Sequence, residues 1–295
     1  PLSDWLEGRW FEPVQAYTNI EPVEIPEDAY SDNFIGQAAL DTLKKFDEED
    51  PWITIVNFPG PHEPMDITPV MADAWRDEEL PYPIGCQHPD ELLVQNIRRH
   101  YAAMIENIDR WIGVFVDQLK AQGQYENTVI VFASDHGEML GDRNLWQKEV
   151  PFEPAVHVPL VISGIGVVPR GNIPEATASL IDLPPTYLQM AGVPIPEEYS
   201  GFDLSSFLNG DDRLPRQHTQ TGLGSWRAVT DGRYKLIVGL DETVPQAEIQ
   251  FGQFDHSLPE AGKLYDLKND PDELTNLWAK ENDVRDRLLA LMPKS

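Results

Sequence analysis

The sequence predicts an α/β protein in which a mostly parallel sheet lies between two layers of helices, followed by a small α+β domain. Nearly continuous apolar runs of strand length occupy 52–58, 128–133 and 158–163. Such runs are typical of strands that are covered on both faces. A long amphipathic helix, predicted for 89–122, separates the first two runs, and this alternation of strand, helix and strand favours a three-layer α/β/α domain.

The helices are predicted from apolar residues that recur at three- and four-residue spacing. In the longest helix, Asp90 is positioned to cap the start and Gly123 to end it. Two shorter helices are predicted near 33–47 and 177–191. The segments before and between these elements, residues 1–35 and 59–89, are expected to be loops, and a loop as long as the second is typically functional or mobile.

Composition changes near 209–216, so we expect a first domain over 1–212 and a second over 213–295. Within the second, an Asp231-Gly232 pair separates two short apolar segments. An Asp-Gly pair in that setting is a strong signal for a β-hairpin. A final helix is predicted for 280–292, which completes a small α+β domain.

The composition excludes some partners. The 295 residues include 50 acidic and 22 basic ones, a formal net charge of −28. This balance argues against nucleic acid and against an anionic membrane surface, because both require a basic face. No apolar run reaches the 18 residues of a membrane span. The single cysteine, Cys86, excludes an internal disulfide, and the opening residues resemble no signal peptide, so the compartment stays open.

Two polar residues directly follow the run 128–133, where ligands bind in open α/β sheets. Asp135 and His136 can both reach one cation: the carboxylate suits a hard metal, and the imidazole shifts the choice toward softer ones. Taken alone, the pair is equally consistent with a turn cap and a surface histidine. Lys148 can hold a sulfate or phosphate oxygen. His62, in a proline-rich loop after 52–58, can donate a proton to an anion or leaving oxygen. Taken singly, each of these two is more often an ordinary surface residue.

In combination, several segments resemble the sulfatase family, within the alkaline-phosphatase-like superfamily. The matching motifs cover most of the chain from about residue 50. They are Ser134-Asp135-His136-Gly137-Glu138-Met139-Leu140-Gly141-Asp142, Leu145-Trp146 with Lys148, Val158-Pro159-Leu160, Pro61-His62 with Pro64, Tyr101 and Asp109, Ile181-Asp182 with Pro185-Thr186, Ala191-Gly192, Arg233-Tyr234-Lys235-Leu236, Leu264-Tyr265-Asp266-Leu267, Asp270-Pro271 with Glu273, and Asn276-Leu277.

The resemblance implies roles for the candidate residues. Asp135 and His136 would be metal ligands, and Lys148 and His62 would contact the sulfate group and help the leaving oxygen depart. The metal would be calcium, as in most sulfatases, although histidine in place of the more usual asparagine leaves magnesium or manganese open. The substrate would be a sulfated small molecule or saccharide.

The sequence also departs from the family pattern. The family nucleophile is a formylglycine made within a Cys/Ser-x-Pro/Ala-x-Arg motif, whereas Cys86 is followed by Gln-His-Pro-Asp and lies after the His62 loop. The early Asp-Asp metal pair has no match, and Arg143 stands where many members have histidine. We therefore expect the later part of a sulfatase domain without its first strands, with the missing part of the site cut away, disordered or supplied by a second chain.

Two expectations follow from these departures. Without the covalent nucleophile, this chain alone should hydrolyse sulfate esters weakly or not at all. The incomplete sheet should expose an apolar edge that favours association. Two alternatives to a sulfatase remain: a phosphonate or phosphodiester hydrolase of the same superfamily, and a non-catalytic sulfatase-like domain that binds metal or sulfated ligands. A third, an unrelated acidic α/β domain, is disfavoured because the motifs match in order.

Overall fold

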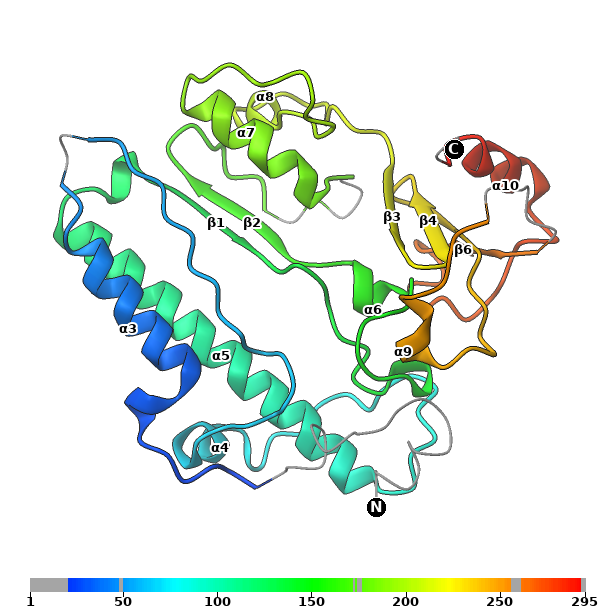
Figure 1. Ribbon diagram of the computed structural model, residues 1–295, viewed down its shortest axis with the longest axis horizontal. Helices are drawn as coiled ribbons and strands as arrows, with labels where there is room; N and C mark the ends of the chain where they lie inside the picture. Colours follow the sequence, from blue (N-terminus) through cyan, green and yellow to red (C-terminus); the bar gives the residue numbers. More distant parts are fainter. Residues whose placement is uncertain (1–20, 48–49, 172, 174–176, 256–260, 293–295) are drawn as a thin grey trace. The chain divides into compact units, whose positions relative to one another are not determined.

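The computed structural model describes residues 21–47, 50–171, 173, 177–255 and 261–292. The predicted lead-in therefore lies outside the described residues over 1–20. The chain forms two compact units (Figure 1). Unit 1 comprises Pro1–Thr128 with Leu140–Trp146, and unit 2 comprises Val129–Met139 with Gln147–Ser295. The domain boundary near residue 212 remains a prediction.

Unit 1 is built on two helices that pack together, α3 (Ser31–Leu43) and α5 (Glu91–Ala121). The prediction for α5 is confirmed at both ends. The Asp90 side chain accepts a hydrogen bond from the Leu93 N–H at 2.9 Å, and Gly123 takes a positive φ of 74° just beyond the helix. Buried residues of α5 pack against the segment that precedes α4, and form a core with Met65, Ile67, Val94, Ile97 and Met104 among its members.

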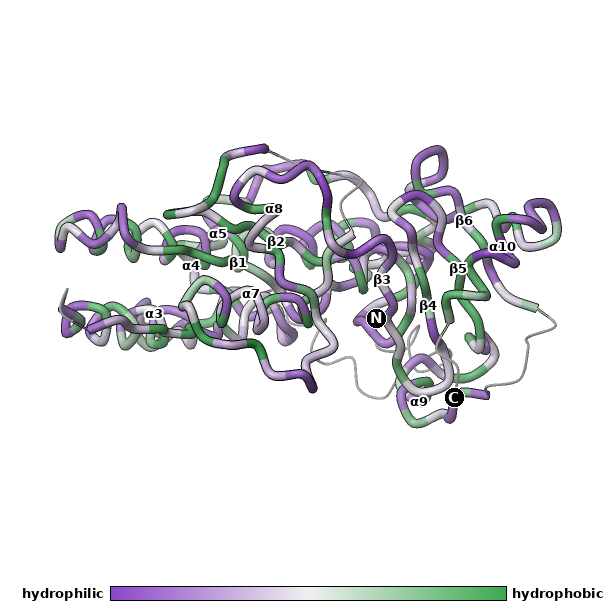
Figure 2. Tube along the Cα trace, turned by 90° about the horizontal axis from the view of Figure 1, so that it is seen from above, coloured by the Kyte–Doolittle hydropathy of each residue, from purple (hydrophilic) through white to green (hydrophobic). Residues whose placement is uncertain are grey.

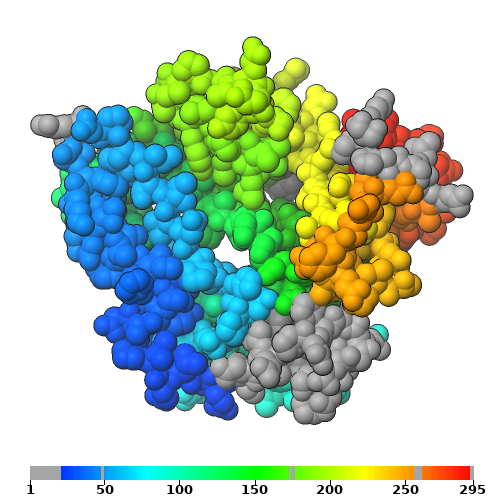
Figure 3. Space-filling model, viewed as in Figure 1, coloured from blue at the N-terminus to red at the C-terminus, as the bar shows by residue number. Residues whose placement is uncertain are grey.

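Two predictions for unit 1 are wrong. The run 52–58 forms no strand, and Ile53 and Ile55 are 71% and 75% exposed. In Figure 3 this segment, in light blue, lies at the surface. An apolar strand needs a neighbouring strand for its backbone groups, and none pairs with it among the described residues. The predicted loop 59–89 contains a helix, α4 (Pro69–Trp75), which Thr68 caps and which begins with a proline.

Unit 2 begins with two strands, β1 (Val129–Ala133) and β2 (Leu160–Gly164). They pair antiparallel, with Val131 opposite Ile162. The strands fall where the sequence predicts them, but their antiparallel pairing contradicts the predicted parallel arrangement. Three short helices belong to the same unit: α6 (Glu153–Val156), α7 (Leu183–Met190) and α8 (Ser205–Leu208). The residues from Leu180 to Asp182 form a 3-10 turn that leads into α7.

A four-stranded antiparallel sheet forms the later part of unit 2, in the order β3-β4-β5-β6. Its strands are β3 (Thr219–Leu223), β4 (Trp226–Thr230), β5 (Tyr234–Val238) and β6 (Lys263–Asp266), with α9 (Gln246–Ile249) and α10 (Asn282–Leu289). The predicted Asp231-Gly232 hairpin is confirmed as the turn between β4 and β5.

The two faces of this sheet are covered differently. Leu288 of α10 packs with Leu236 and Val238 on one face. Figure 2 shows the apolar character of β5. Because side chains alternate along a strand, Lys235 and Ile237 point to the opposite face, and both are buried. None of the helices in the described ranges is long and apolar enough to cross a membrane.

Candidate active site

The end of β1 leads directly into Asp135 and His136. The imidazole Nδ1 lies 2.8 Å from the Gly137 carbonyl oxygen. A carbonyl oxygen only accepts, so Nδ1 is the donor of this hydrogen bond. Nε2 lies 3.8 Å from Oδ2 of Asp135, while Oδ1 of the same carboxylate accepts from the His136 N–H at 2.9 Å. Oδ2 of Asp135 and Nε2 of His136 therefore lie close to each other just beyond β1.

The backbone after His136 is tied to α6. The Gly137 N–H donates to the Ala155 carbonyl at 2.8 Å, and the Glu138 N–H donates to the Pro154 carbonyl at 2.9 Å. A Cβ on Gly137 would lie 2.0 Å from the Pro154 oxygen. Glycine at this position allows the two segments to approach, so α6 fixes the path of the chain just beyond the candidate ligands.

Lys148 lies in a segment that is bound to the same turn. The Met139 N–H donates to the Gln147 carbonyl at 2.9 Å, and the Gln147 N–H donates to the Glu138 carboxylate. Gln147 itself has a φ of 62°, a conformation that non-glycine residues adopt only when their surroundings enforce it. Hydrogen bonds therefore link the segment that carries Lys148 to the segment that carries Asp135 and His136.

The residue after Lys148 is anchored by the C-terminal sheet. The buried Trp226 indole on β4 donates to the Glu149 carbonyl at 2.9 Å, and Gln246 on α9 reaches the Glu149 carboxylate at 3.4 Å. The sequence analysis did not find these contacts. In hindsight, the sequence hints at them only through Trp226, a large side chain at the start of a strand and next to a turn.

A buried ionic cluster joins the same sheet to α6. The Lys235 ammonium lies 2.8 Å from Oε1 of Glu153 and 2.9 Å from Oε1 of Glu273, and His157 Nδ1 donates to Glu153 Oε2 at 2.8 Å. Glu273 in turn accepts from the Glu153 N–H at 2.8 Å. Lys235 and Glu273 are 2% and 1% exposed, so this pair is made inside the protein, whereas the His157 side chain of the same cluster is largely exposed.

The cluster shifts the acid–base properties of its members. Burial raises the pKa of Glu153, but hydrogen bonds from His157 and Lys235 outweigh burial and lower that pKa to about 2. Burial raises the pKa of Glu273. The hydrogen bond to Glu153 raises the pKa of His157, and partial burial opposes it. Glu153 is thus held as a carboxylate at the start of α6.

His62 belongs to unit 1, whereas Asp135, His136 and Lys148 belong to unit 2. Its imidazole is about half exposed, and Nδ1 donates to the Glu63 carbonyl at 2.6 Å. The His62 N–H donates to the Pro59 carbonyl at 3.1 Å, which closes a turn over Pro59–His62. The Gly60-Pro61 and Glu63-Pro64 peptide bonds are cis. That His62 acts together with the other three residues is a prediction.

Asp135 and His136 supply donor atoms that suit part of a cation site. A gap of 3.8 Å between Asp135 Oδ2 and His136 Nε2 is within the span of two ligands that each lie about 2.4 Å from one cation. The described ranges contain no group of three or more His, Cys, Asp or Glu residues able to hold a metal ion. Asp135 and His136 therefore fit a cation as two of the several ligands that it needs.

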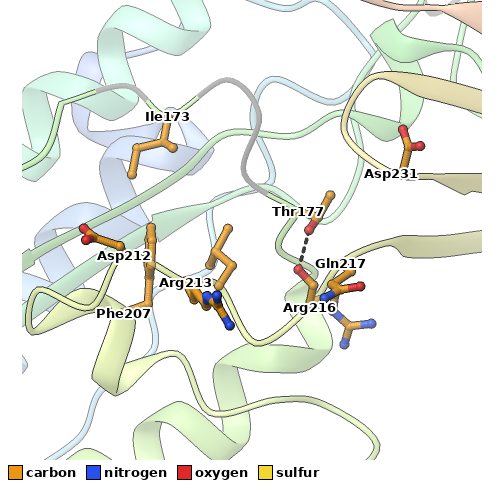
Figure 4. Close-up of a pocket in the computed structure, with 9 residues that line it drawn as sticks. Ile173, Thr177, Phe207, Asp212, Arg213, Arg216, Gln217 and Asp231 are labelled. Carbon is orange, nitrogen blue, oxygen red and sulfur yellow. Dashed lines mark hydrogen bonds between the residues drawn. The ribbon is translucent and has the colours of Figure 1, made fainter.

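A pocket among the described residues lies elsewhere in unit 2. Figure 4 shows this cavity of about 480 Å³, with Arg213, Arg216 and Asp231 among its lining residues. Arg216 already pairs with the buried carboxylate of Asp182, and its carbonyl accepts from Thr177 at 2.7 Å. None of the four predicted site residues lines the cavity. Its basic side chains are offset by acidic ones, so it does not favour an anion.

The chain was compared with models of known protein families. The sulfatase family model matches residues 3–193, and a model described as N-sulphoglucosamine sulphohydrolase, C-terminal, matches residues 141–292. The chain belongs to the sulfatase family. The resemblance drawn from the sequence motifs is thereby confirmed.

Curated relatives of the chain include two bacterial enzymes. It is 26% identical over 277 residues to an arylsulfatase of Clostridium perfringens, a match that covers 86% of this chain and 55% of the relative. It is 28% identical over 310 residues to a choline-sulfatase of Rhizobium meliloti, with coverage of 93% and 56%. The chain thus spans about half the length of these curated relatives.

Solved structures confirm the alkaline-phosphatase-like α/β fold. The chain matches a phosphonate monoester hydrolase from Silicibacter pomeroyi with a TM-score of 0.76 and 22% identity, over 97% of this chain and 66% of that one. It matches a protein solved in complex with its substrate D-glucosamine-2-N,6-O-disulfate with a TM-score of 0.71 and 18% identity, over 89% and 69%. At these identities the likeness establishes the fold alone.

Proposed function

We propose that this chain forms the metal- and anion-binding part of an active site that hydrolyses a sulfate ester. The observation that carries the proposal is the arrangement at the end of β1, where Oδ2 of Asp135 and Nε2 of His136 lie 3.8 Å apart, close enough to be ligands of one cation. Membership of the sulfatase family and the names of the curated relatives support the same chemistry.

Each residue would have a separate task. Asp135 and His136 would hold a divalent cation, most simply calcium, with magnesium or manganese as alternatives. When bound, the cation would offset negative charge that develops on the sulfate oxygens. Lys148 would bind a sulfate oxygen as a point charge, and His62 would deliver a proton to the leaving oxygen.

The proposed substrate class is broader than any single compound. A sulfated small molecule or saccharide is supported by a structural relative solved with a disulfated glucosamine and by another described as a glycosaminoglycan 2-O sulfatase. Hydrolysis of phosphonate monoesters is the second candidate, which the Silicibacter pomeroyi structure favours. A role in binding without catalysis is the third.

Binding of calcium and of inorganic sulfate tests the proposal without requiring turnover. We expect Asp135→Asn to raise the calcium dissociation constant at least tenfold in isothermal titration calorimetry, because a neutral amide replaces a charged ligand. Lys148→Ala should weaken sulfate binding by a similar factor. Asp211→Asn removes an exposed carboxylate of the same unit and should change neither constant.

Turnover separates the alternatives. The chain is assayed with an aryl sulfate and with an aryl phosphonate monoester in the presence of calcium. Faster release from the sulfate, lost in Lys148→Ala, supports the sulfatase assignment, whereas faster release from the phosphonate supports the second candidate. If calcium and sulfate binding are unchanged in both site variants, the proposed site is wrong.

A further inference from the structure

We propose that Asp32 is a positioning residue for His62. The proposal rests on the proposed function, because His62 needs an exact place only if it contacts a sulfate group or its leaving oxygen. The two residues are 30 positions apart, yet Asp32 contacts the turn that carries His62 through Gly60.

The contact is made by a carboxylate that is fully buried. Asp32 lies in the first turn of α3 and has no exposed surface. Its Oδ1 accepts a hydrogen bond from the Gly60 N–H at 3.1 Å, and its Oδ2 has no hydrogen-bond partner among the described residues. A Cβ on Gly60 would lie 2.3 Å from Oδ2. Glycine at position 60 therefore lets the carboxylate approach the backbone of the turn.

Stability alone is a poor reason for such a residue. Burial raises the pKa of Asp32, because the charged form loses its hydration, and the Gly60 N–H only partly offsets this. A buried carboxylate with a single hydrogen bond and an unpartnered oxygen destabilises a fold relative to an apolar side chain. Its position near the helix N-terminus compensates for part of this penalty. We attribute the rest of this penalty to a function of the turn that Asp32 holds.

The turn transmits the position of Gly60 to His62. The His62 N–H donates to the Pro59 carbonyl at 3.1 Å, so the turn is closed on both sides of Gly60. Pro61, between Gly60 and His62, has a ring that restricts its φ. A shift of Gly60 therefore moves the imidazole, and displacement of a catalytic group by about 1 Å can lower a rate by about a hundredfold.

Electrostatics and positioning predict opposite effects of removing Asp32. Loss of a negative charge near an anion site should strengthen anion binding by Coulomb's law. Loss of the hydrogen bond to Gly60 should weaken it, because His62 is no longer held in place. Asp32→Ala removes both charge and acceptor, whereas Asp32→Asn removes the charge and keeps an oxygen that can accept from Gly60. Asp41→Ala, on the exposed face of the same helix, controls for charge.

The experiment measures binding of inorganic sulfate to the full chain in the presence of calcium. We expect Asp32→Ala to raise the dissociation constant at least fivefold, and Asp32→Asn and Asp41→Ala to change it less than twofold. Gly60→Ala keeps every charge but pushes against Asp32, and should weaken binding as Asp32→Ala does. If thermal melting shows that Asp32→Ala does not fold, Gly60→Ala tests the proposal in its place.

A double-mutant cycle distinguishes positioning from general damage. In a His62→Ala background, Gly60→Ala should cause no further loss of sulfate binding, because the group that it displaces is absent. Additive losses would overturn the positioning role. So would unchanged or tighter binding in both Asp32→Ala and Gly60→Ala while His62→Ala weakens binding. If the unaltered chain does not bind sulfate, or His62→Ala has no effect, the proposed function of His62 fails instead.

Discussion

Replacing Lys235 by methionine should destabilise unit 2 by several kcal/mol. The ammonium is 2% exposed and pairs with both Glu153 and Glu273, of which the second is 1% exposed. Methionine fills a similar volume but leaves the carboxylates without their cation. Removing one partner of a buried ion pair costs about 3–5 kcal/mol, so we expect a loss of this size at pH 7.

Urea unfolding followed by tryptophan fluorescence measures this loss. With a slope of about 2–3 kcal/mol per molar urea, the midpoint should fall by about 1–2 M. Lys263→Met is the matched control, because Lys263 on β6 pairs at 2.8 Å with Glu242, whose side chain is 54% exposed. An exposed pair contributes about 0–1 kcal/mol, so this variant should unfold almost as the unaltered chain does.

The pH dependence gives a second check on the same variant. Without Lys235, both glutamates should take up protons more readily, and a neutral carboxyl is less costly to bury. The deficit of Lys235→Met should therefore shrink as the pH falls from 7 toward 4. Equal effects of Lys235→Met and Lys263→Met, or a deficit that grows on acidification, would refute the view that the cluster is held by its buried charge.

Three further predictions concern single positions. The pKa of His157 is raised in the folded protein, so its stabilising effect is complete below its unfolded pKa of about 6.5 and is lost as the pH rises through its folded pKa. His157→Gln should therefore make the melting temperature depend less on pH between pH 6 and 8. Gly137→Ala should destabilise the protein by about 1–3 kcal/mol in urea, because its Cβ would overlap the Pro154 oxygen. Gly113→Ala should stabilise α5 by about 0.5–1 kcal/mol in the same assay, because the added methyl group meets no atom within 4 Å.

Short sequence patterns correctly predicted the elements whose ends are decided by adjacent residues. Asp90 and Gly123 mark the ends of α5 because capping and left-handed termination are decided within one helical turn. Asp231-Gly232 marks the β4–β5 turn for the same reason. The run 52–58 has the composition of a strand, but a strand exists only where a neighbour pairs with it, and no local pattern specifies that neighbour. The antiparallel pairing of β1 and β2 was missed because apolar runs do not encode strand direction.

The candidate site shows the same contrast between residues that lie in local motifs and contacts between distant segments. Asp135, His136, Lys148 and His62 were found because they lie in recognisable motifs, and their joint action remains a prediction. The residues that hold them were not identified. Lys235 lies in the predicted hairpin, and a lysine within an apolar strand usually marks an exposed edge. Its burial depends on Glu153 and Glu273, which are 82 and 38 residues away. Glu273 lies in a motif that matches the family, but nothing in that motif shows that it pairs with Lys235.

These contacts connect the C-terminal sheet to the proposed site. One face of β5 packs on α10 through Leu236, and the other presents Lys235 to Glu153 at the start of α6. Because the carbonyls of α6 accept from Gly137 and Glu138, the sheet fixes the backbone just beyond Asp135 and His136. Trp226 holds the residue after Lys148. A substitution such as Lys235→Met should therefore weaken calcium and sulfate binding together, although it touches neither the proposed ligands nor the anion.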